Sequence, residues 1–311
     1  MADKIVVLVG SRASALAKAQ VREVLTPLRR QLPHVDFRHR VILEGGDRDR
    51  RTPTLAEVAK SSGGSAFSSS QEAALLAGEV DVIVHSLKDL PTTMPAGLML
   101  LTTPGPRADV RDALCGHSLD SLPHGARVGT GAPRRVAQLL ALRPDLILVP
   151  IRGNVGPRLA RIKTGTVDAV LLAAAGLQRL SLDEHVTQYL DARMFLPSPG
   201  QGALGIQVRE GSEAARLLGH TGDAAADAAV RAERSLLAEL HGGCSVPVGA
   251  YARPEPGGQL HLSGAVTALD GTRQVTANAS GPVGEPEKLG RTVADALRAK
   301  GAEHILAAIR T

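Results

Sequence analysis

Aromatic residues are almost absent from this sequence, whose 311 residues include three Phe, two Tyr and no Trp. Proteins that bind single-stranded nucleic acid stack bases on aromatic side chains, so the composition argues against a nucleic-acid partner. The net charge of +5 is spread along the chain and forms no basic tail. This distribution favours small anionic ligands over a polyanion.

Cysteine is equally scarce, with one residue at Cys115 and one at Cys244. Two cysteines so far apart form neither a disulfide framework nor a zinc pattern, and we expect no metal. Cys115 ends a short apolar, strand-like stretch and is predicted to be a small buried side chain. Cys244 follows two glycines in a loop, which indicates a thiol exposed enough to be modified, although most free cysteines are buried.

The sequence also lacks long apolar segments. No stretch of about 18 apolar residues occurs, so no membrane-spanning helix is expected. Lys4 is followed only by the short apolar run Ile5–Val9, which does not resemble a signal peptide. We therefore expect a cytoplasmic protein with no membrane partner.

Arginine, in contrast, is abundant and supplies 29 of the 36 basic residues. Its planar guanidinium suits bidentate recognition of carboxylates and phosphates. Hydrophobic residues make up 43% of the chain, enough for two or three domains at roughly 100–200 residues each.

The first third of the chain alternates strand and helix signals. We predict strands at Ile5–Val9, Val35–Leu43 and Val80–His85 and helices at about Ser14–Arg30 and Ser70–Ala77. Residues 44–70 are rich in Gly, Ser, Arg and Asp, and a loop of this length is usually functional or disordered. A lid over a ligand cleft is the role that we expect for it.

A second unit begins near Arg107. Its predicted strands are Arg127–Thr130, Leu146–Pro150 and Ala169–Ala173, with helices starting near Arg134 and Val155. The alternation predicts a mostly parallel sheet with helices on both faces. Gln201–Val208 is predicted to be one more strand, which returns to the first sheet.

The last ninety residues change in character. A predicted helix at about Ala224–Leu240 precedes three strand-like runs, and two helices end the chain. Strands followed by helices favour a small α+β domain with an antiparallel sheet. We thus expect residues 1–105 with about 201–221 to form an α/β domain, 106–200 a second α/β domain, and 222–311 the α+β domain.

Polar residues cluster where several strands are expected to end. In open α/β sheets, ligands bind beyond the carboxyl ends of strands. The turn at Gly10–Ser14 places Arg12 at a helix start, which suits an anion, although a capped helix with a solvated arginine would look the same. His85–Pro91 directly follows a buried strand and contains a Lys-Asp pair, which could equally be a surface salt bridge.

Further arginines follow strands of the second unit: Arg134, Arg135, Arg152, Arg158 and Arg179. One such residue would be an ordinary surface arginine. Several at one sheet edge indicate a receptor for multiple carboxylates.

These segments together resemble the porphobilinogen deaminase family. The resemblance is an ordered series over nearly the whole chain, formed by the Ser-Arg-x-Ser start at Ser11, His85-Ser86-Leu87-Lys88-Asp89-Leu90-Pro91, Arg107-Ala108-Asp109-Val110-Arg111-Asp112-Ala113, Val128-Gly129-Thr130, Arg134-Arg135, Arg152-Gly153-Asn154-Val155, Leu196-Pro197-Ser198-Pro199-Gly200-Gln201-Gly202-Ala203 and Gly243-Cys244-Ser245-Val246-Pro247. The resemblance implies two doubly wound, periplasmic-binding-protein-like α/β domains plus a small α+β C-terminal domain.

The implied activity joins four porphobilinogen molecules, with release of ammonia, into the linear tetrapyrrole hydroxymethylbilane. The resemblance also implies a monomer and a dipyrromethane cofactor held by Cys244 through a thioether. It implies Asp89 as the catalytic carboxylate, which stabilises positive charge on the reacting pyrrole. The implied cofactor contacts are Ser14, Ser86, Lys88, Thr130, Arg134, Arg135 and Arg158, and the implied substrate contacts are Arg12, Arg152, Arg179 and Gln20.

The sequence departs from this family at Gly63–Phe67, which is shorter, and at Ala132, where a serine is frequent. A catalytically impaired or specialised relative, which binds pyrroles or another polycarboxylate in the same cleft, is therefore an alternative. A solute-binding protein of the same architecture is disfavoured by the missing signal peptide and by the third domain.

Overall fold

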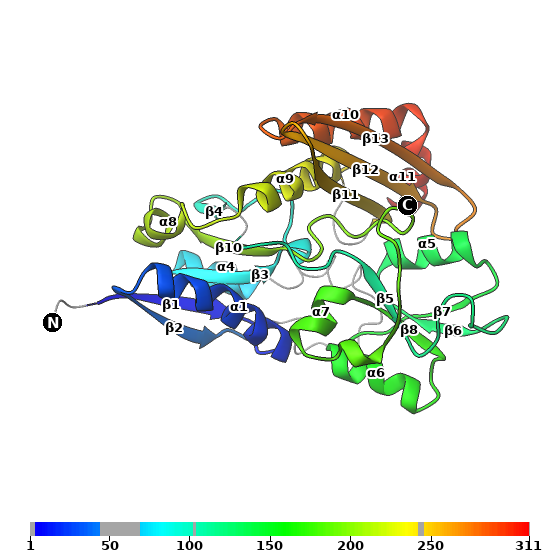
Figure 1. Cartoon of the computed structure of the whole chain (residues 1–311), viewed down its shortest axis with the longest axis horizontal. Coiled ribbons are helices and arrows are strands. Elements are labelled where there is room, and N and C mark those ends of the chain that lie inside the picture. Colours follow the sequence, from blue (N-terminus) through cyan, green and yellow to red (C-terminus); the bar gives the residue numbers. More distant parts are fainter. Residues whose placement is uncertain (1–3, 44–68, 102–103, 242–245, 311) are drawn as a thin grey trace.

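The computed structural model describes residues 4–43, 69–101, 104–241 and 246–310. Their strands form three sheets. Figure 1 shows two α/β units side by side, the first in blue and cyan and the second in green, with a three-stranded sheet and its red helices above them. The expected lid, residues 44–70, lies outside the described residues except for its last two, which begin a helix.

The first unit is a five-stranded sheet in the order β2-β1-β3-β10-β4. Its strands are β1 (Ile5–Ser11), β2 (Val35–Val41), β3 (Val82–Ser86), β4 (Leu98–Leu101) and β10 (Leu204–Arg209). Helices α1 (Ala15–Gln31) and α8 (Glu213–Leu218) bury their apolar sides in the core on one face. Helix α4 (Ser69–Leu76) packs in the smaller core on the other face, so the sheet is doubly wound.

The second unit repeats this arrangement with the order β7-β6-β8-β5-β9. Its strands are β5 (Asp112–Cys115), β6 (Arg127–Gly129), β7 (Ile147–Val149), β8 (Ala169–Ala173) and β9 (Val186–Tyr189). Helix α5 (Pro133–Leu142) contributes to the core on one face. Helices α6 (Val155–Lys163) and α7 (Ala174–Arg179) contribute to the core on the other.

The expectation of mostly parallel sheets is confirmed, and each of the two α/β sheets contains one reversed strand. β10 is antiparallel to both β3 and β4, and β5 is antiparallel to both β8 and β9. In each case the reversed strand is the first one formed after the chain crosses from the other unit. The return of β10 to the first sheet is confirmed, whereas the edge strands β4 and β9 were not expected.

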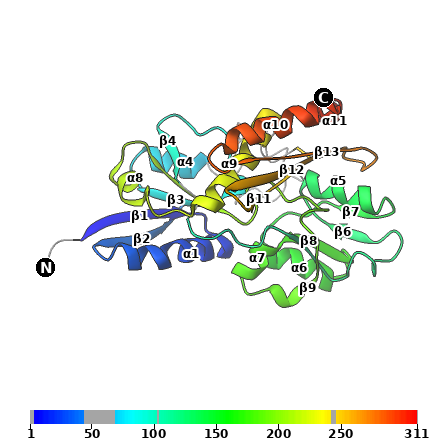
Figure 2. The same cartoon turned by 45° about the horizontal axis from the view of Figure 1, so that its top comes forward.

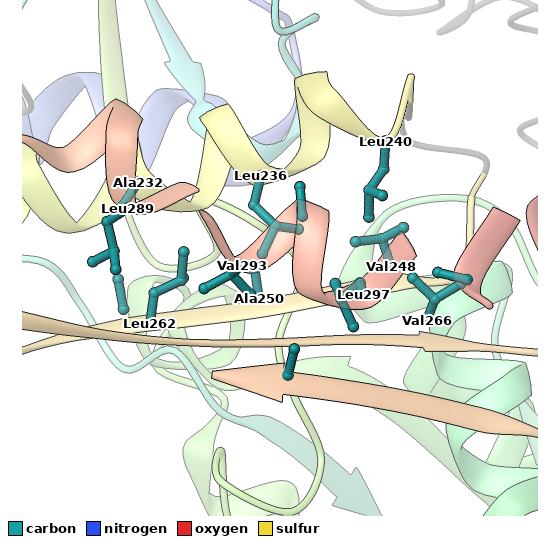
Figure 3. Close-up of a cluster of buried hydrophobic side chains, with 14 of the residues drawn as sticks. Ala232, Leu236, Leu240, Val248, Ala250, Leu262, Val266, Leu289, Val293 and Leu297 are labelled. Carbon is teal, nitrogen blue, oxygen red and sulfur yellow. The ribbon is translucent and has the colours of Figure 1, made fainter. Parts of the chain in front are cut away.

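The third unit is an antiparallel sheet in the order β11-β12-β13, as predicted. Its elements are α9 (Ala224–Glu239), β11 (Val248–Glu255), β12 (Gln259–Thr267), β13 (Gln274–Pro282), α10 (Pro286–Ala299) and α11 (Ala302–Arg310). Figure 3 shows Leu236 of α9 and Val293 of α10 meeting Ala250 and Leu262 of the sheet in one core. Figure 2 shows α10 and α11 on the side of this sheet away from the second α/β unit. Helix α9 also packs on the first unit, where Val230 joins a small core beside Leu87 and Leu90.

Two crossover segments, residues 104–111 and 190–203, connect the α/β units and touch each other. The amide of Ala108 donates to the carbonyl of Gly202 at 3.3 Å. A Cβ on Gly202, whose φ is 86°, would lie 2.4 Å from the oxygen of Ala108. Only glycine allows this approach, which sets the position of the neighbouring Gln201.

Helix α1 begins at a capping serine. The Oγ of Ser14 accepts a hydrogen bond from the amide of Ala17 at 3.1 Å, which satisfies one of the free N–H groups of the first turn. We expect Ser14→Ala to lower the free energy of unfolding by about 1 kcal/mol. Urea unfolding would measure this loss, and Ser14→Asp, which keeps an acceptor, should restore the stability. An unchanged midpoint in Ser14→Ala would contradict the capping role.

Candidate active site

Two buried arginines from the first turn of α5 form the centre of the candidate site. Arg134 and Arg135 are 4% and 5% exposed, and both contact Asp112, the fully buried first residue of β5. Nη2 of Arg134 lies 2.7 Å from Oδ2 of Asp112. Nη2 and Nε of Arg135 donate to Oδ1 at 2.7 and 3.0 Å. Sequence reasoning predicted the arginines but did not select this carboxylate.

Lys88 of the first unit joins this cluster through Gln201. Its Nζ donates to Oε1 of Gln201 at 3.1 Å, and Nε2 of Gln201 donates to Oδ1 of Asp112 at 3.0 Å. Loss of solvent around the ammonium and the charge of Arg135 lower the pKa of Lys88 to about 8. Arg134, Arg135 and Lys88 together hold the pKa of Asp112 at about 2 despite its burial.

Asp89 ends the 3-10 turn η1 (Leu87–Asp89), directly after β3. Its carboxylate is half-exposed and opposes the fall in the pKa of Arg158, across the boundary between the two α/β units. Burial, followed by the charge of Arg135, lowers the pKa of Arg158 to about 10, and Arg152 contributes in the same direction. Asp89 therefore lies among cations from both units.

Arg12 and Gln20 lie near the same end of the first sheet. Nε2 of Gln20 donates to Oγ of Ser86 at 2.6 Å, which links α1 to the end of β3. His85, one residue earlier, is buried, and its pKa falls to about 4 because of burial and the nearby charge of Arg12. His85 is consequently neutral near pH 7 and contacts Oε1 of Gln207 at 2.9 Å.

Arg179 occupies a different environment from the other arginines. Its Nε and Nη2 donate to Glu23 of α1 at 2.7 and 3.0 Å, and Nη2 also donates to the carbonyl of Gly202 at 2.9 Å. Its side chain is 9% exposed. The guanidinium thus connects α7 to α1 across the two α/β units, and a substrate carboxylate would have to displace Glu23 from it.

The remaining predicted residues are placed as follows. Thr130 is buried at the end of β6, and its Oγ1 accepts from the amide of Ala132 at 3.4 Å. Nε of Arg158 donates to the carbonyl of Gly153 at 2.7 Å. Cys244 lies outside the described residues. The prediction for Cys115 is confirmed, because its thiol is buried and burial raises its pKa to about 11.

One further acidic residue, Glu233 of α9, was missed from the sequence. Its fully buried carboxylate receives two hydrogen bonds from Arg107, at 2.7 and 2.8 Å. It also accepts from the amides of Gly200, at 2.7 Å, and Ala252, at 2.8 Å. Glu233 therefore ties both crossover segments to the third unit, directly beside Gln201.

The arrangement as a whole is suited to a ligand with several carboxylates. The charge of Arg135 contributes to lowering the pKa values of Lys88, Arg134 and Arg158, and Arg152 contributes to that of Arg158. The five cations therefore lie close together, with the carboxylates of Asp89 and Asp112 among them. Five positive charges against two negative ones leave three positive charges in excess. Partly desolvated guanidinium groups bind carboxylates strongly.

Comparisons with known proteins agree with this chemistry. The family model described as "Porphobilinogen deaminase, dipyromethane cofactor binding domain" matches residues 7–216, and "Porphobilinogen deaminase, C-terminal domain" matches residues 228–299. The porphobilinogen deaminase of Desulforudis audaxviator is 46% identical, with 98% of each chain covered. That of Thermus thermophilus is 43% identical, with 98% of this chain and 99% of the relative covered.

Among solved structures, the methionine-binding protein MetQ aligns with a TM-score of 0.44 and 14% identity, covering 70% of this chain and 89% of that chain. None of the described helices is long and apolar enough to cross a membrane. Two family models that together span most of the sequence, and relatives above 40% identity over nearly its full length, decide its membership. The chain belongs to the porphobilinogen deaminase family.

Proposed function

We propose that, as the enzyme of this family, the protein carries its dipyrromethane cofactor on Cys244 and receives the cofactor carboxylates at Lys88, Arg134, Arg135 and Arg158. The observation that supports this assignment is the excess of positive charge among these buried or half-buried cations. Such a cluster is costly to bury unless an anionic ligand offsets the charge.

The residues present fit that cofactor. The acetate and propionate groups of its pyrrole rings are anions. Among the described residues, Asp112 and the carbonyls of Leu196 and Leu171 take up only part of the N–H groups of Arg134 and Arg135. When bound, the cofactor supplies the primer to which pyrrole units are added. Ser14, Ser86 and Thr130 are proposed to contribute hydroxyl contacts.

The substrate is porphobilinogen, and we propose that Arg12, Gln20, Arg152 and Arg179 bind its carboxylates and its growing chain. Asp89 is the proposed catalytic residue. Its carboxylate stabilises the positive charge that develops when ammonia leaves, and it accepts hydrogen bonds from pyrrole N–H groups. Lys88 and Arg158, whose charges both interact with that of Asp89, hold the cofactor carboxylates near it.

The division of the chain is part of the same proposal. Residues 1–105 with about 201–221, residues 106–200 and residues 222–311 would form three domains, in keeping with the three sheets. We further propose a cytoplasmic monomer that binds no nucleic acid, which the low aromatic content supports.

The decisive experiment is the intact mass of the denatured protein, purified from a host that makes porphobilinogen. We expect the wild type and Cys115→Ser to carry a covalent excess equal to one dipyrromethane, and Cys244→Ser to carry none. The Cys115 thiol is a matched control because it is buried and stays protonated near pH 7. An excess that persists in Cys244→Ser would overturn the assignment of the attachment site.

A further inference from the structure

Asp112 presents a contradiction within the proposed cofactor site. The site binds carboxylates, yet a fully buried carboxylate already occupies its arginines. By charge alone, Asp112 should weaken the binding of an anionic cofactor. A buried aspartate here must therefore contribute something that outweighs the weaker binding of the cofactor.

The benefit follows from the neighbours of Asp112. Arg134 and Arg135 are consecutive in α5 and have side chains only 5% and 6% exposed. Two adjacent buried cations without a counter-charge carry a large desolvation cost. Asp112 offsets this cost, and its two oxygens hold one guanidinium each. The arginines are thereby fixed before any ligand arrives.

Asp112 also acts across the boundary between the α/β units. Gln201, from the second crossover segment, donates to Oδ1 of Asp112 and to the carbonyl of Val110, at 3.0 and 2.8 Å. These bonds orient the amide so that its oxygen faces Nζ of Lys88 at 3.1 Å. One carboxylate thus positions two cations directly and a third through an amide.

The charge that remains still attracts the ligand. Lys88, Arg134 and Arg135 supply three positive charges against the one negative charge of Asp112, so two positive charges stay in excess. Oδ2 of Asp112 contacts Arg134 at 2.7 Å without the geometry of a hydrogen bond. The ion pair nevertheless holds the Arg134 guanidinium in place, and its Nη1 also donates to the carbonyl of Leu196 at 2.8 Å.

We propose that Asp112 is the positioning residue of the cofactor site, a built-in counter-anion that holds Arg134 and Arg135 directly, and Lys88 through Gln201, in the arrangement that receives the cofactor carboxylates. This inference rests on the proposed function, because it takes these three cations as cofactor ligands. Asp112 itself does not touch the reacting atoms in this proposal.

The test compares Asp112→Asn, which keeps the shape and removes the charge, with the control Asp109→Asn. Asp109 lies three residues earlier in the same segment and forms a more exposed ion pair with Arg111. Apo-protein is mixed with porphobilinogen, and the covalent mass excess is followed with time. We expect loading to slow by about 10–100-fold in Asp112→Asn, the cost found when groups that orient direct ligands are removed from metal sites. Asp109→Asn should load at the wild-type rate.

The pH dependence of loading separates positioning from mere stability. Lys88 faces Arg134, Arg135, Asp89 and Asp112, and Asp112 is one of the two carboxylates that keep it protonated. Without that negative charge, Lys88 loses its proton at lower pH. We therefore expect the alkaline limit of loading to move to lower pH in Asp112→Asn, whereas a loss of stability alone leaves the limit unchanged.

A second variant keeps the test decisive if Asp112→Asn does not fold. Gln201→Met disconnects Lys88 from Asp112 and leaves both arginine contacts in place, so it should slow loading more mildly. Loading at the wild-type rate and with the wild-type pH limit, in whichever of the two variants folds, would overturn the inference. A wild type that never gains the covalent excess would instead overturn the proposed function.

Discussion

Replacing Glu233 with alanine is expected to lower the free energy of unfolding by about 3–5 kcal/mol, the usual cost of breaking a buried ion pair from one side. The substitution leaves the Arg107 guanidinium, which is 10% exposed, without its counter-charge. It also leaves the buried amides of Gly200 and Ala252 without their acceptor. Each such loss adds a desolvation penalty.

Chemical denaturation of the apo-protein measures this effect, and the chain offers a matched control. Glu287, at the start of α10, forms an ion pair of similar length with Arg231 of α9, but the two side chains are 42% and 52% exposed. Glu287→Ala should therefore cost at most about 1 kcal/mol. Equal losses in the two variants would show that Glu233 does not hold the three units together.

The burial of Glu233 could be predicted from the sequence of α9, but its partner could not. Ala229, Glu233, Leu236 and Leu240 follow one another at intervals of four, three and four residues, which places them on one face of a helix. A charged residue on an apolar face indicates a buried partner. The partner itself, Arg107, lies 126 residues away, and no local pattern identifies it.

The direction of β10 in the first sheet was likewise not predictable from the sequence. The apolar run that became β10 was predicted, together with its return to the first sheet, because it lies beyond the second unit. Its reversed direction was not predicted, because the alternation of side chains reads alike in both directions. Direction is set by the crossover segments, whose path depends on contacts such as that between Ala108 and Gly202.

The short edge strands β4 and β9 had even less signal. Each has four residues, too few for a clear period of two. The candidate site residues had a clearer signal in the sequence, because the motifs follow strand ends, where ligand-binding groups gather in this type of fold. Their partners had none, since Glu23 and Arg179 are separated by 156 residues and meet only after both units have formed.

Asp89→Asn is expected to reduce kcat by about 100- to 10,000-fold, the range typical of a group that stabilises charge or moves a proton in the transition state. The variant keeps the size of the side chain and removes its charge. Within the described part of the chain, no group donates a hydrogen bond to this carboxylate, which is half-exposed. The substitution should therefore leave the fold intact.

Cofactor attachment provides the internal control for this prediction. Asp89 is not among the groups that we propose to hold the cofactor carboxylates, so Asp89→Asn protein should retain the full covalent mass excess while it consumes porphobilinogen slowly. Asp36→Asn, in an exposed ion pair with Arg38 on β2, should retain both the mass and the turnover. A kcat within threefold of the wild type would remove Asp89 from the chemistry. Loss of the mass excess would instead assign Asp89 to cofactor loading, because a carboxylate needed only for later additions cannot affect the primer.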